Sequence, residues 1–454
     1  MQIVLPKKVN KIIRTLQDAG YEAYAVGGCV RDSLLGKTPN DWDITTSADP
    51  YEVKSLFRRT FDTGIKHGTV TVLMGNDSYE VTTYRIDGLY EDSRHPKEVT
   101  FTSDLKEDLL RRDFTINAMA YNESAGLVDE FNGLKDLENG TIRAVGNARE
   151  RFSEDALRIL RALRFSAQLD YEIEDGTREA IRELAPTLSN ISAERIRTEL
   201  MKLLGSDHPD NIRDGYELGI TRVILPEFDL MMETPQNTPY HSWNAGEHTL
   251  RAIIEAVKED HVFSQKDMGY IRLALLFHDM GKPASRTTDE NGRDHFYGHP
   301  EKSEEIARDI MKRLKFDNET IKKVCPLVRY HDTKPKLTPY DIRKFMVRVG
   351  PELMDMLFVV KRADMNAHSD YRRDEREAYE KGLEAACRET VENGDCLSLK
   401  ELAVNGKDLI GAGLKPGKAI GDALEAMLEY VLKDPSRNSK EKLMQFYFNE
   451  NVIS

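Results

Sequence analysis

The stretch of sequence that decides the fold reads VGGCVRDSLLGKTPNDWDIT and spans residues 26–45. Residues 21–30 are predicted to form a strand, and residues 30–35 are predicted to begin the following helix. Gly27 and Gly28 lie at this junction, where glycine lets the backbone approach a phosphate closely and the start of a helix offers free N–H groups. Because an isolated Gly-Gly pair is more often an ordinary turn, its meaning depends on the residues that follow.

Two carboxylates, Asp41 and Asp43, come ten residues after this turn. If residues 41–45 form a strand, side chains two positions apart point to the same side. Adjacent carboxylates repel each other unless a cation lies between them, and two divalent ions held in this way suit in-line displacement at a phosphoryl group. Glu80, on the predicted strand 79–85, is a candidate third carboxylate. The alternative for an isolated Asp-x-Asp is a solvated strand end.

The rest of the chain changes character after about residue 150. Residues 1–150 alternate short strands (21–30, 67–74 and 79–85) with helices (8–19 and 50–58), whereas the remainder reads as successive helices. At about 150 residues per domain, a chain of 454 residues predicts about three domains. The fold class is therefore multidomain α+β and all-α, with a small α/β head before a mainly helical part. Its expected divisions are 1–150, 151–228, 229–370 and 371–454.

Charge and composition exclude several classes of protein. The 65 Lys and Arg against 78 Asp and Glu leave a net charge of −13, which argues against non-specific binding of nucleic acid through overall charge, although a local basic path is compatible with it. No run of about 18 apolar residues predicts a spanning helix, and the N-terminus lacks the pattern of a signal peptide. Four scattered cysteines predict free thiols and a cytoplasmic location.

Two arginine-rich motifs can bind nucleotides. LRRDFTINAM (residues 110–119) contains Arg112, Asp113 and Asn117, and the planar fork of arginine suits phosphate oxygens. RFSEDALRILRALRF (residues 151–165) has helical apolar spacing, which predicts that Asp155 and Arg158 share one helix face. Together they can read the hydrogen-bonding edge of a nucleobase. The alternatives are an ion pair at Asp113 and a surface ion pair between Asp155 and Arg158.

Taken in order, the motifs GGCVRD, NDWDITT, RRDFTINAMAYN, RFSEDALRILRALRF and ISAERIRTELMKLL resemble the class II tRNA nucleotidyltransferases. This family comprises the CCA-adding enzymes and their bacterial poly(A) polymerase relatives, and its core is similar to the DNA polymerase β superfamily. The resemblance covers roughly residues 20–204. It implies a head with the nucleotidyltransferase fold and an enzyme that adds CCA to tRNA 3′ ends from CTP and ATP, releasing pyrophosphate and using Mg²⁺.

The resemblance also implies a role for each matching residue. Gly27, Gly28 and Arg31 would hold the triphosphate, and Asp41 and Asp43 would bind the catalytic metals. Arg112, Asp113 and Asn117 would contact ribose and phosphates; Asp155 and Arg158, supported by Glu154, would pair with the incoming base, and residues 191–203 would form a helix that stabilises them. Residues 87–97 resemble the family's flexible loop, which is associated with the switch from adding C to adding A.

Histidines and aspartates gather between residues 229 and 370. The pattern resembles the HD phosphohydrolase superfamily, which implies an unidentified divalent metal that activates water against a phosphoester. The implied ligands are His248, His278, Asp279 and Asp364, with His299 and His331 as additional ligands. His241 and His295 are expected in packing or solvent. The alternative is a helical scaffold that binds no metal.

The C-terminal part carries Gly411, Gly413 and Gly417 among lysines, and it resembles the tail with which CCA-adding enzymes contact tRNA. The alternative is a helical pair packed on the body. The expected partners are thus tRNA, CTP and ATP, with no membrane and no DNA. Two rival functions stand beside this one. An A-adding or poly(A)-synthesising relative shares the motifs, whereas a signalling enzyme that joins a nucleotidyltransferase to an HD module does not explain RRDFTINAMAYN followed by EDALRILRALRF.

Overall fold

The computed structural model describes residues 3–87, 99–259 and 261–450. The chain divides into two compact units, Met1–Pro226 and Glu227–Ser454. Each unit contains its own candidate site.

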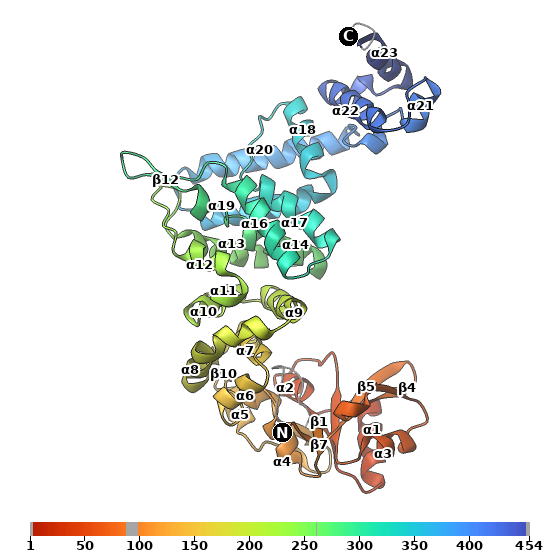
Figure 1. The fold of residues 1–454 in the computed structure, drawn as a ribbon, viewed down its shortest axis with the longest axis vertical. Helices are drawn as coiled ribbons and strands as arrows, with labels where there is room; N and C mark the ends of the chain where they lie inside the picture. The colour runs from red at the N-terminus through yellow and green to blue at the C-terminus, as the bar shows by residue number, and fades with distance from the viewer. Residues whose placement is uncertain (1–2, 88–98, 260, 451–454) are drawn as a thin grey trace. The chain divides into compact units, whose positions relative to one another are not determined.

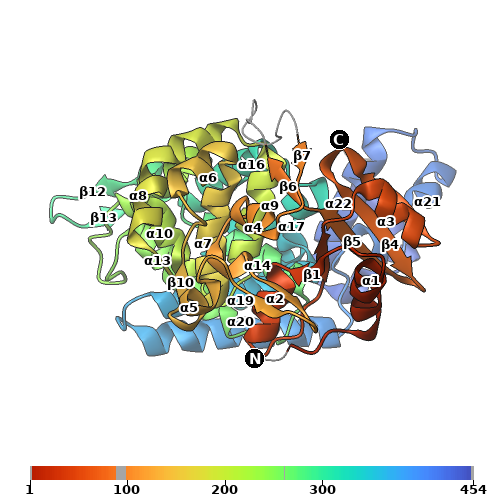
Figure 2. The same cartoon turned by 90° about the horizontal axis from the view of Figure 1, so that it is seen from below.

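The first unit is built around a mixed sheet with the strand order β3-β4-β5-β2-β1-β8-β9. Strands β2 and β5 pair in parallel, and the other neighbours pair antiparallel. Helices α1 and α3 lie beside β4 and β5 in both views (Figures 1 and 2). The strands of the sheet are β1 (Ala23–Val26), β2 (Asp43–Thr46), β3 (Thr60–Gly64), β4 (Thr69–Met74), β5 (Asp77–Thr83), β8 (Ala120–Asn122) and β9 (Gly126–Val128).

Helix α1 attaches to this sheet because its apolar residues recur at helical spacing, so that one face is fully buried. The short helix α3 begins with a capping box formed by Asp49 and Glu52. Two small pairs of strands accompany the main sheet: β6 (Arg85–Asp87) with β7 (Val99–Phe101), and β10 (Thr141–Ile142) with β11 (Glu172–Ile173).

The second half of this unit is helical, and α6 packs on α8 while α7 packs on α9. The helices of the unit are α1 (Lys7–Asp18), α2 (Gly28–Leu34), α3 (Pro50–Leu56), α4 (Leu105–Leu110), α5 (Gly133–Glu138), α6 (Ala148–Glu154), α7 (Leu157–Leu169), α8 (Asp175–Leu184), α9 (Ala193–Leu204), α10 (Ile212–Glu217) and α11 (Thr221–Ile224).

The second unit is a helical body around α14, which is buried along nearly its whole length. Helices α13, α17 and α19 pack on α14, and α22 packs on α21 and α23 near the C-terminus. Its helices are α13 (Ala245–Val257), α14 (Gln265–Phe277), α15 (Lys282–Ser285), α16 (His299–Arg313), α17 (Asn318–Tyr330), α18 (Pro339–Val349), α19 (Met354–Ala367), α20 (Arg373–Glu392), α21 (Gly406–Gly411), α22 (Lys418–Lys433) and α23 (Lys440–Glu450); α12 (Pro226–Met232) begins at the unit boundary, and β12 (Thr287–Thr288) pairs with β13 (Asp294–His295).

The predicted fold class is confirmed, with local differences. The strand predicted over 21–30 is limited to β1, because Gly27 adopts φ 83° and α2 already begins at Gly28. Strand β2 begins at Asp43, so Asp41 lies just before it and outside the strand. All four cysteines are free and buried, as predicted. Among the described residues, no helix has the length and apolarity needed to cross a membrane.

Candidate functional sites

The glycine turn brings two arginines close to the end of β1. Gly27 has φ 83°, in the left-handed region that favours glycine. A Cβ at Gly27 would lie 3.2 Å from Nη1 of Arg112, and one at Gly28 would lie 3.7 Å from Nη2 of Arg31. Both glycines therefore make room for guanidinium groups that can bind phosphate oxygens.

Three carboxylates gather beside this turn. Because Ile44 pairs with Val81 in the parallel ladder, the preceding residues Asp43 and Glu80 are neighbours in adjacent strands. Both side chains are exposed, so the loss of hydration that raises the pKa of Asp43 is partial; Arg112 lowers this pKa and Asp41 raises it, with a net upward shift. Partial loss of hydration also raises the pKa of Glu80, and the charges of Asp43 and Asp41 raise it further. Oxygen donors that repel one another in this way fit a divalent cation, since the cation removes the repulsion.

A chain of hydrogen bonds connects the arginine at the turn with the second motif. Nη1 of Arg31 donates to Oδ1 of Asn117 at 2.6 Å, and Nδ2 of Asn117 donates to Oδ1 of Asp113 at 3.2 Å. Arg161 donates from Nε to Oδ2 of Asp113 at 2.7 Å. Burial alone would raise the pKa of Asp113, but Arg161 and these hydrogen bonds lower it to about 2. The structure therefore places Arg31, Asp113 and Asn117 together, and among the described residues the Asp113 carboxylate is paired with Arg161.

Phe165 on α7 supports the same group of arginines. The guanidinium carbons of Arg31, Arg161 and Arg164 lie 5.0, 5.4 and 3.9 Å from the centre of its ring. Arg164 also donates to Glu199 on α9 at 2.6 Å. An aromatic face attracts cations, so this ring holds arginines of α2 and α7 side by side.

The predicted base-reading residues lie around a break between two helices. Helix α6 ends at Glu154 and α7 begins at Leu157, so the prediction that Asp155 and Arg158 share one helix face is wrong. The physical reason is that Asp155 leaves the helical conformation, with φ −140°, and its carboxylate accepts from the backbone N–H of Leu157 at 3.0 Å. The side chain of Asp155 thus caps the N-terminal end of α7, and its backbone does not continue α6.

The two residues have separate partners. Asp155 accepts from Nη2 of Arg195, on α9, at 2.7 Å. Arg158 donates to Glu154 at 2.6 Å and to the carbonyl of Arg111 at 2.8 Å. Helix α9 therefore fixes Asp155, while Glu154 and the second motif fix Arg158. Both side chains are held before any nucleotide binds.

The predicted histidine–aspartate cluster is assembled by five helices of the second unit. His248 lies in α13 and Asp364 in α19. His278 and His331 lie at the C-terminal ends of α14 and α17, and His299 is the first residue of α16. Asp279 follows His278 directly. The structure thus gathers in one place all six residues that the sequence suggested as ligands.

The two oxygens of Asp279 face two groups of histidines. Oδ2 lies 3.2 Å from Nε2 of His278 and 3.7 Å from Nε2 of His248. Oδ1 lies 3.4 Å from Nε2 of His299 and 3.9 Å from Nε2 of His331. A carboxylate in this position can bridge two metal ions.

Asp364 completes the first of these groups. Its Oδ1 lies 2.8 Å from Nε2 of His248 and 3.4 Å from Nε2 of His278. The first group therefore offers two imidazoles and two carboxylates, whereas the second offers two imidazoles and the shared Asp279.

Backbone carbonyls orient three of the rings for metal binding. Nδ1 of His278, His299 and His331 lies 2.6, 2.9 and 2.7 Å from the carbonyl oxygens of Leu275, Phe296 and Val328. A ring that donates from Nδ1 presents Nε2 as the free metal-binding nitrogen. Nε2 of His278 and both oxygens of Asp279 are buried and make no hydrogen bond of good geometry among the described residues, although the ammonium of Lys282 lies 2.7 Å from Oδ2 of Asp279. Nε2 of His278 and Oδ1 of Asp279 therefore fit a metal better than they fit a dry core, whereas Oδ2 already has a cationic neighbour.

Electrostatics in the cluster follow from the same contacts. Burial alone would lower the pKa of His278, but Asp279 and Asp364 raise it to about 10. Burial and the neighbouring His278 and His299 lower the pKa of His331 to about 3. A bound divalent ion would replace the proton on His278 and would find His331 already neutral.

Gly281 gives the sequence pattern His-Asp-Met-Gly-Lys a physical explanation. A Cβ at this position would lie 2.4 Å from the carbonyl oxygen of His299 and 2.7 Å from the backbone nitrogen of Ser303. Only glycine lets α16 approach this closely. The glycine therefore helps to place His299 beside Asp279.

The cluster opens into a cavity of about 550 Å³. Six cationic side chains contribute to its lining: Lys282, Arg293, Lys334, Lys361, Arg372 and Arg376. Nε and Nη1 of Arg376 are buried without a hydrogen-bond partner among the described residues. The same lining holds six carboxylates, and Lys282, Lys334, Lys361 and Arg372 each pair with one of them. The buried guanidinium of Arg376 is thus a group that can meet an anionic ligand next to the candidate metal ligands.

Sequence reasoning missed four residues at these sites. Arg161 and Arg195 bind Asp113 and Asp155, and His241 and His368 lie beside His248. His368 could have been found, because it follows Asp364 by four residues and so lies on the same side of α19. His241 lies in a loop, where spacing gives no signal. The predicted loop at 87–97 lies almost wholly outside the described residues.

Comparison with known proteins identifies the separate parts of the chain. Residues 23–143 match the poly A polymerase head domain. Residues 170–232 match a model named for the RNA- and SrmB-binding site of polymerase A, and residues 296–447 match a model named for tRNA nucleotidyltransferase domain 2.

Relatives match the chain over nearly its whole length. The CCA-adding enzyme of Enterococcus faecalis is 36% identical over 451 residues, covering 97% of this chain and 95% of the relative. That of Lactobacillus helveticus is 34% identical, covering 97% of this chain and 96% of the relative. The crystal structure of the Bacillus stearothermophilus CCA-adding enzyme in complex with CTP is 29% identical with a TM-score of 0.71, covering 99% of both chains. The chain belongs to the CCA-adding enzyme family of tRNA nucleotidyltransferases.

Proposed function

We propose that this protein adds C, C and A to the 3′ ends of tRNA from CTP and ATP. The terminal 3′-hydroxyl attacks the α-phosphate of the nucleotide, and pyrophosphate leaves. The observation that carries this proposal is the placement of Asp41, Asp43 and Glu80 beside the glycine turn in a chain of the CCA-adding family.

Each residue has a task in this reaction. Asp41 and Asp43, with Glu80, would hold Mg²⁺, which supplies activation of the 3′-hydroxyl and charge neutralisation at the leaving pyrophosphate when bound. Arg31 and Arg112 would bind the triphosphate at the opening that Gly27 and Gly28 leave. The fixed orientation of Arg31 through Asn117 lowers the entropic cost of binding.

Base selection is assigned to Asp155 and Arg158. A carboxylate accepts and a guanidinium donates, so the pair can recognise the edges of cytosine and adenine without a nucleic-acid template. A wrong base leaves a hydrogen-bonding group unpaired at a cost of about 1–3 kcal/mol. Both side chains are already fixed, Asp155 by Arg195 and Arg158 by Glu154.

Each of the four predicted parts of the chain is proposed to have its own role. Residues 1–150 would form the nucleotidyltransferase head, 151–228 the base-binding neck, 229–370 the metal-binding body and 371–454 a tRNA-binding tail. In the tail, Lys407, Lys415 and Lys418 are exposed, while Gly413 and Gly417 have positive φ and open space around them. Such backbone N–H groups and lysines can contact RNA phosphates.

Variants of the two aspartates test the catalytic assignment. Asp41→Ala with Asp43→Ala is expected to abolish nucleotide addition while tRNA binding stays within about twofold, because the side chains serve chemistry and not RNA affinity. Asp62→Ala is a matched control, since this exposed aspartate of β3 pairs only with Lys54 in the described contacts. Retained addition by the double variant would reject the assigned metal site.

We also propose a second activity, metal-dependent hydrolysis of a nucleotide phosphoester in the second unit. The observation that favours it is the pair of ligand groups on either side of Asp279 at the wall of a cavity that the buried guanidinium of Arg376 also lines. The identity of the divalent metal is left to the assay, since imidazole and carboxylate ligands suit several ions.

Phosphate release from nucleotides and cyclic nucleotides, measured with Mg²⁺, Mn²⁺, Co²⁺ and Ni²⁺, tests this second activity. His278→Ala with Asp279→Ala is expected to lose all hydrolysis and to keep CCA addition. His295→Ala is the control, because His295 binds Asp289 and lies outside the ligand groups. Hydrolysis that persists in the double variant would overturn the assignment.

A further inference from the structure

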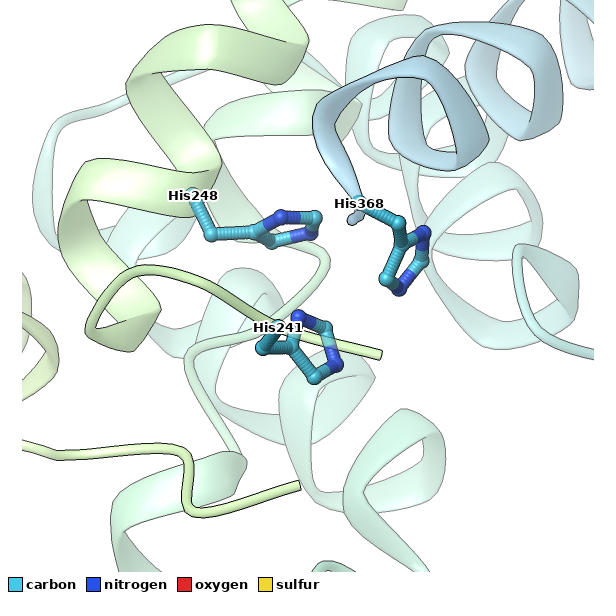
Figure 3. Close-up of side chains that lie close together, drawn as sticks. All are labelled: His241, His248 and His368. Carbon is cyan, nitrogen blue, oxygen red and sulfur yellow. The ribbon is translucent and has the colours of Figure 1, made fainter. Parts of the chain in front are cut away.

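A third group of ligand-type side chains consists of His248 and two further histidines. Figure 3 shows the rings of His241, His248 and His368, which come from the loop before α13, from α13 and from the end of α19. The ring centres are 4.4–4.9 Å apart, and one nitrogen of each ring lies within 4.8 Å of the others. Three imidazoles at this spacing can bind a single ion.

The nitrogens of the two outer rings lack protein partners. Nδ1 of His241 and Nδ1 of His368 are buried and have no hydrogen-bond partner among the described residues. Leaving such a group unsatisfied costs about 1–3 kcal/mol, so two adjacent cases call for an explanation.

The first group of the histidine–aspartate cluster shares His248 with these rings. Nε2 of His248 lies 2.8 Å from Oδ1 of Asp364, which also lies 3.4 Å from Nε2 of His278, and the ring centres of His241 and His368 lie 4.9 and 4.8 Å from that of His248. An ion bound to His248 can thus find two ligand sets, one rich in carboxylates and one made of imidazoles. The ligand sets differ in the ions that they favour, because imidazole suits Zn²⁺, Ni²⁺ and Cu²⁺, while carboxylate suits Mg²⁺ and Mn²⁺.

We propose that His241, His248 and His368 form a three-histidine metal position that binds a nitrogen-preferring ion such as Zn²⁺, sharing His248 with the histidine–aspartate cluster. Both outer rings line the cavity, so an ion there can keep a position open to solvent or ligand. The three histidines would let the histidine–aspartate cluster bind nitrogen-preferring ions beside the ions that its carboxylates favour. The inference goes beyond both proposed activities and shares with the proposed phosphohydrolase only His248 and its surroundings.

Metal titration of the full chain tests this position. The metal-free protein is titrated with Zn²⁺ and, separately, with Mn²⁺ in competition with a chromophoric chelator. His241→Gln with His368→Gln is expected to weaken Zn²⁺ binding at least about tenfold and to leave Mn²⁺ binding within about twofold. His295→Gln is the matched control, because it removes an imidazole at the same cavity that belongs to no three-residue ligand group. It should change neither affinity.

Unchanged Zn²⁺ affinity in the double variant would overturn the proposal, and so would an equal loss of Zn²⁺ and Mn²⁺, which indicates a packing role. Circular dichroism in EDTA establishes that the variant is folded, and the single variant His368→Gln, at the end of α19, replaces it if it is not. Loss of phosphoester hydrolysis in all proteins, with the Zn²⁺ difference intact, would remove the phosphohydrolase proposal and leave the metal position standing.

Discussion

Asp43 and Glu80 are held together by strand pairing at a cost to the head. Their neighbouring positions in β2 and β5 follow from the backbone register, which keeps both carboxylates on the same side of the sheet. Both pKa values are raised above those of a free carboxyl group. A folded-state pKa above the unfolded value means that the stability this group contributes is present at low pH and is lost as pH rises through the folded pKa.

At neutral pH, therefore, Asp43→Asn and Glu80→Gln are each expected to raise the melting temperature of the metal-free protein. Addition of Mg²⁺ should raise the melting temperature of the natural chain and have less effect on the variants, because the ion then has fewer ligands. Calorimetry with and without EDTA measures both effects. Asp62→Asn is the control, and equal melting temperatures for all four proteins without metal would contradict the account.

The pKa of Asp113, which pairs with Arg161 in the interior, is shifted in the opposite direction, below that of a free carboxyl group. A depressed pKa contributes stability that is present above the unfolded value of about 3.9 and is lost as pH falls toward about 2. Asp113→Asn is expected to lower the free energy of unfolding at pH 7 by about 1–3 kcal/mol, because Arg161 keeps its charge and loses its acceptor. Urea unfolding measures this. Asp77→Asn, which breaks an exposed and solvent-screened pair with Lys8, should change the free energy of unfolding much less, and equal effects would contradict the prediction.

At the scale of single residues, the sequence predicted identities better than contacts. All six candidate metal ligands of the second unit come together, as the resemblance to the HD superfamily implied. Arg161 was not predicted as the partner of Asp113, since 48 residues separate them and only the packing of α7 brings them together. Contacts between distant segments depend on tertiary structure, which periodicity does not contain.

The turn between β1 and α2 has a conformation that its sequence requires. Gly27 combines a positive φ with the close approach of Arg112, whereas Gly36, at the end of α2, has φ 71° and open space around its Cα. Substitution at Gly27 or Gly36 therefore strains the backbone in the same way, but only a side chain at Gly27 would contact Arg112. Comparing the two substitutions thus separates the effect on Arg112 from the effect on the backbone of the turn.

Both Gly27→Ala and Gly36→Ala are expected to destabilise the protein by about 1–2 kcal/mol through the left-handed conformation. Only Gly27→Ala should also raise the KM for CTP and ATP, because its methyl group displaces Arg112 from the phosphate site. Steady-state kinetics with chemical unfolding separates the effects. A similar KM increase in both variants would show that Arg112 is not involved.

Helix α9 is expected to control base selection through Arg195. Arg195→Met removes the partner of Asp155 and keeps a similar length of side chain, so misincorporation of UTP and GTP should rise about tenfold or more while stability changes little. Lys202→Met, in the last turn of the same helix, is the control. Competition assays with all four nucleotides measure the ratio, and unchanged selectivity would contradict a role for α9.

The junction of α6 and α7 explains why this element was only partly predicted. The spacing of apolar residues in RFSEDALRILRALRF is continuous, and continuity predicts one helix. The break arises from the side chain of Asp155, which binds the N–H of Leu157 and a residue of α9. Acidic residues cap helices as readily as they occupy them, so the pattern alone does not distinguish the two.

For the whole molecule, the net charge of −13 conceals local cation sites. The residues proposed to meet nucleotide and RNA are Arg31 and Arg112 in the head, Arg158 in the neck and the exposed lysines of the tail. Binding of tRNA should therefore weaken steeply with salt, because phosphate contacts release counterions, and duplex DNA should bind weakly. A filter-binding series in salt with both nucleic acids measures this. Tight binding of arbitrary duplex DNA at moderate salt would contradict it.

The most direct test of the central claim is the sequence of the 3′ end of a tRNA that lacks CCA, determined after incubation with the protein, CTP, ATP and Mg²⁺. The account predicts that C, C and A are added in that order and that extension then stops. Addition of A alone or of a long A tail would contradict the claim and favour the A-adding or poly(A)-synthesising relative, and no extension at all would reject the activity.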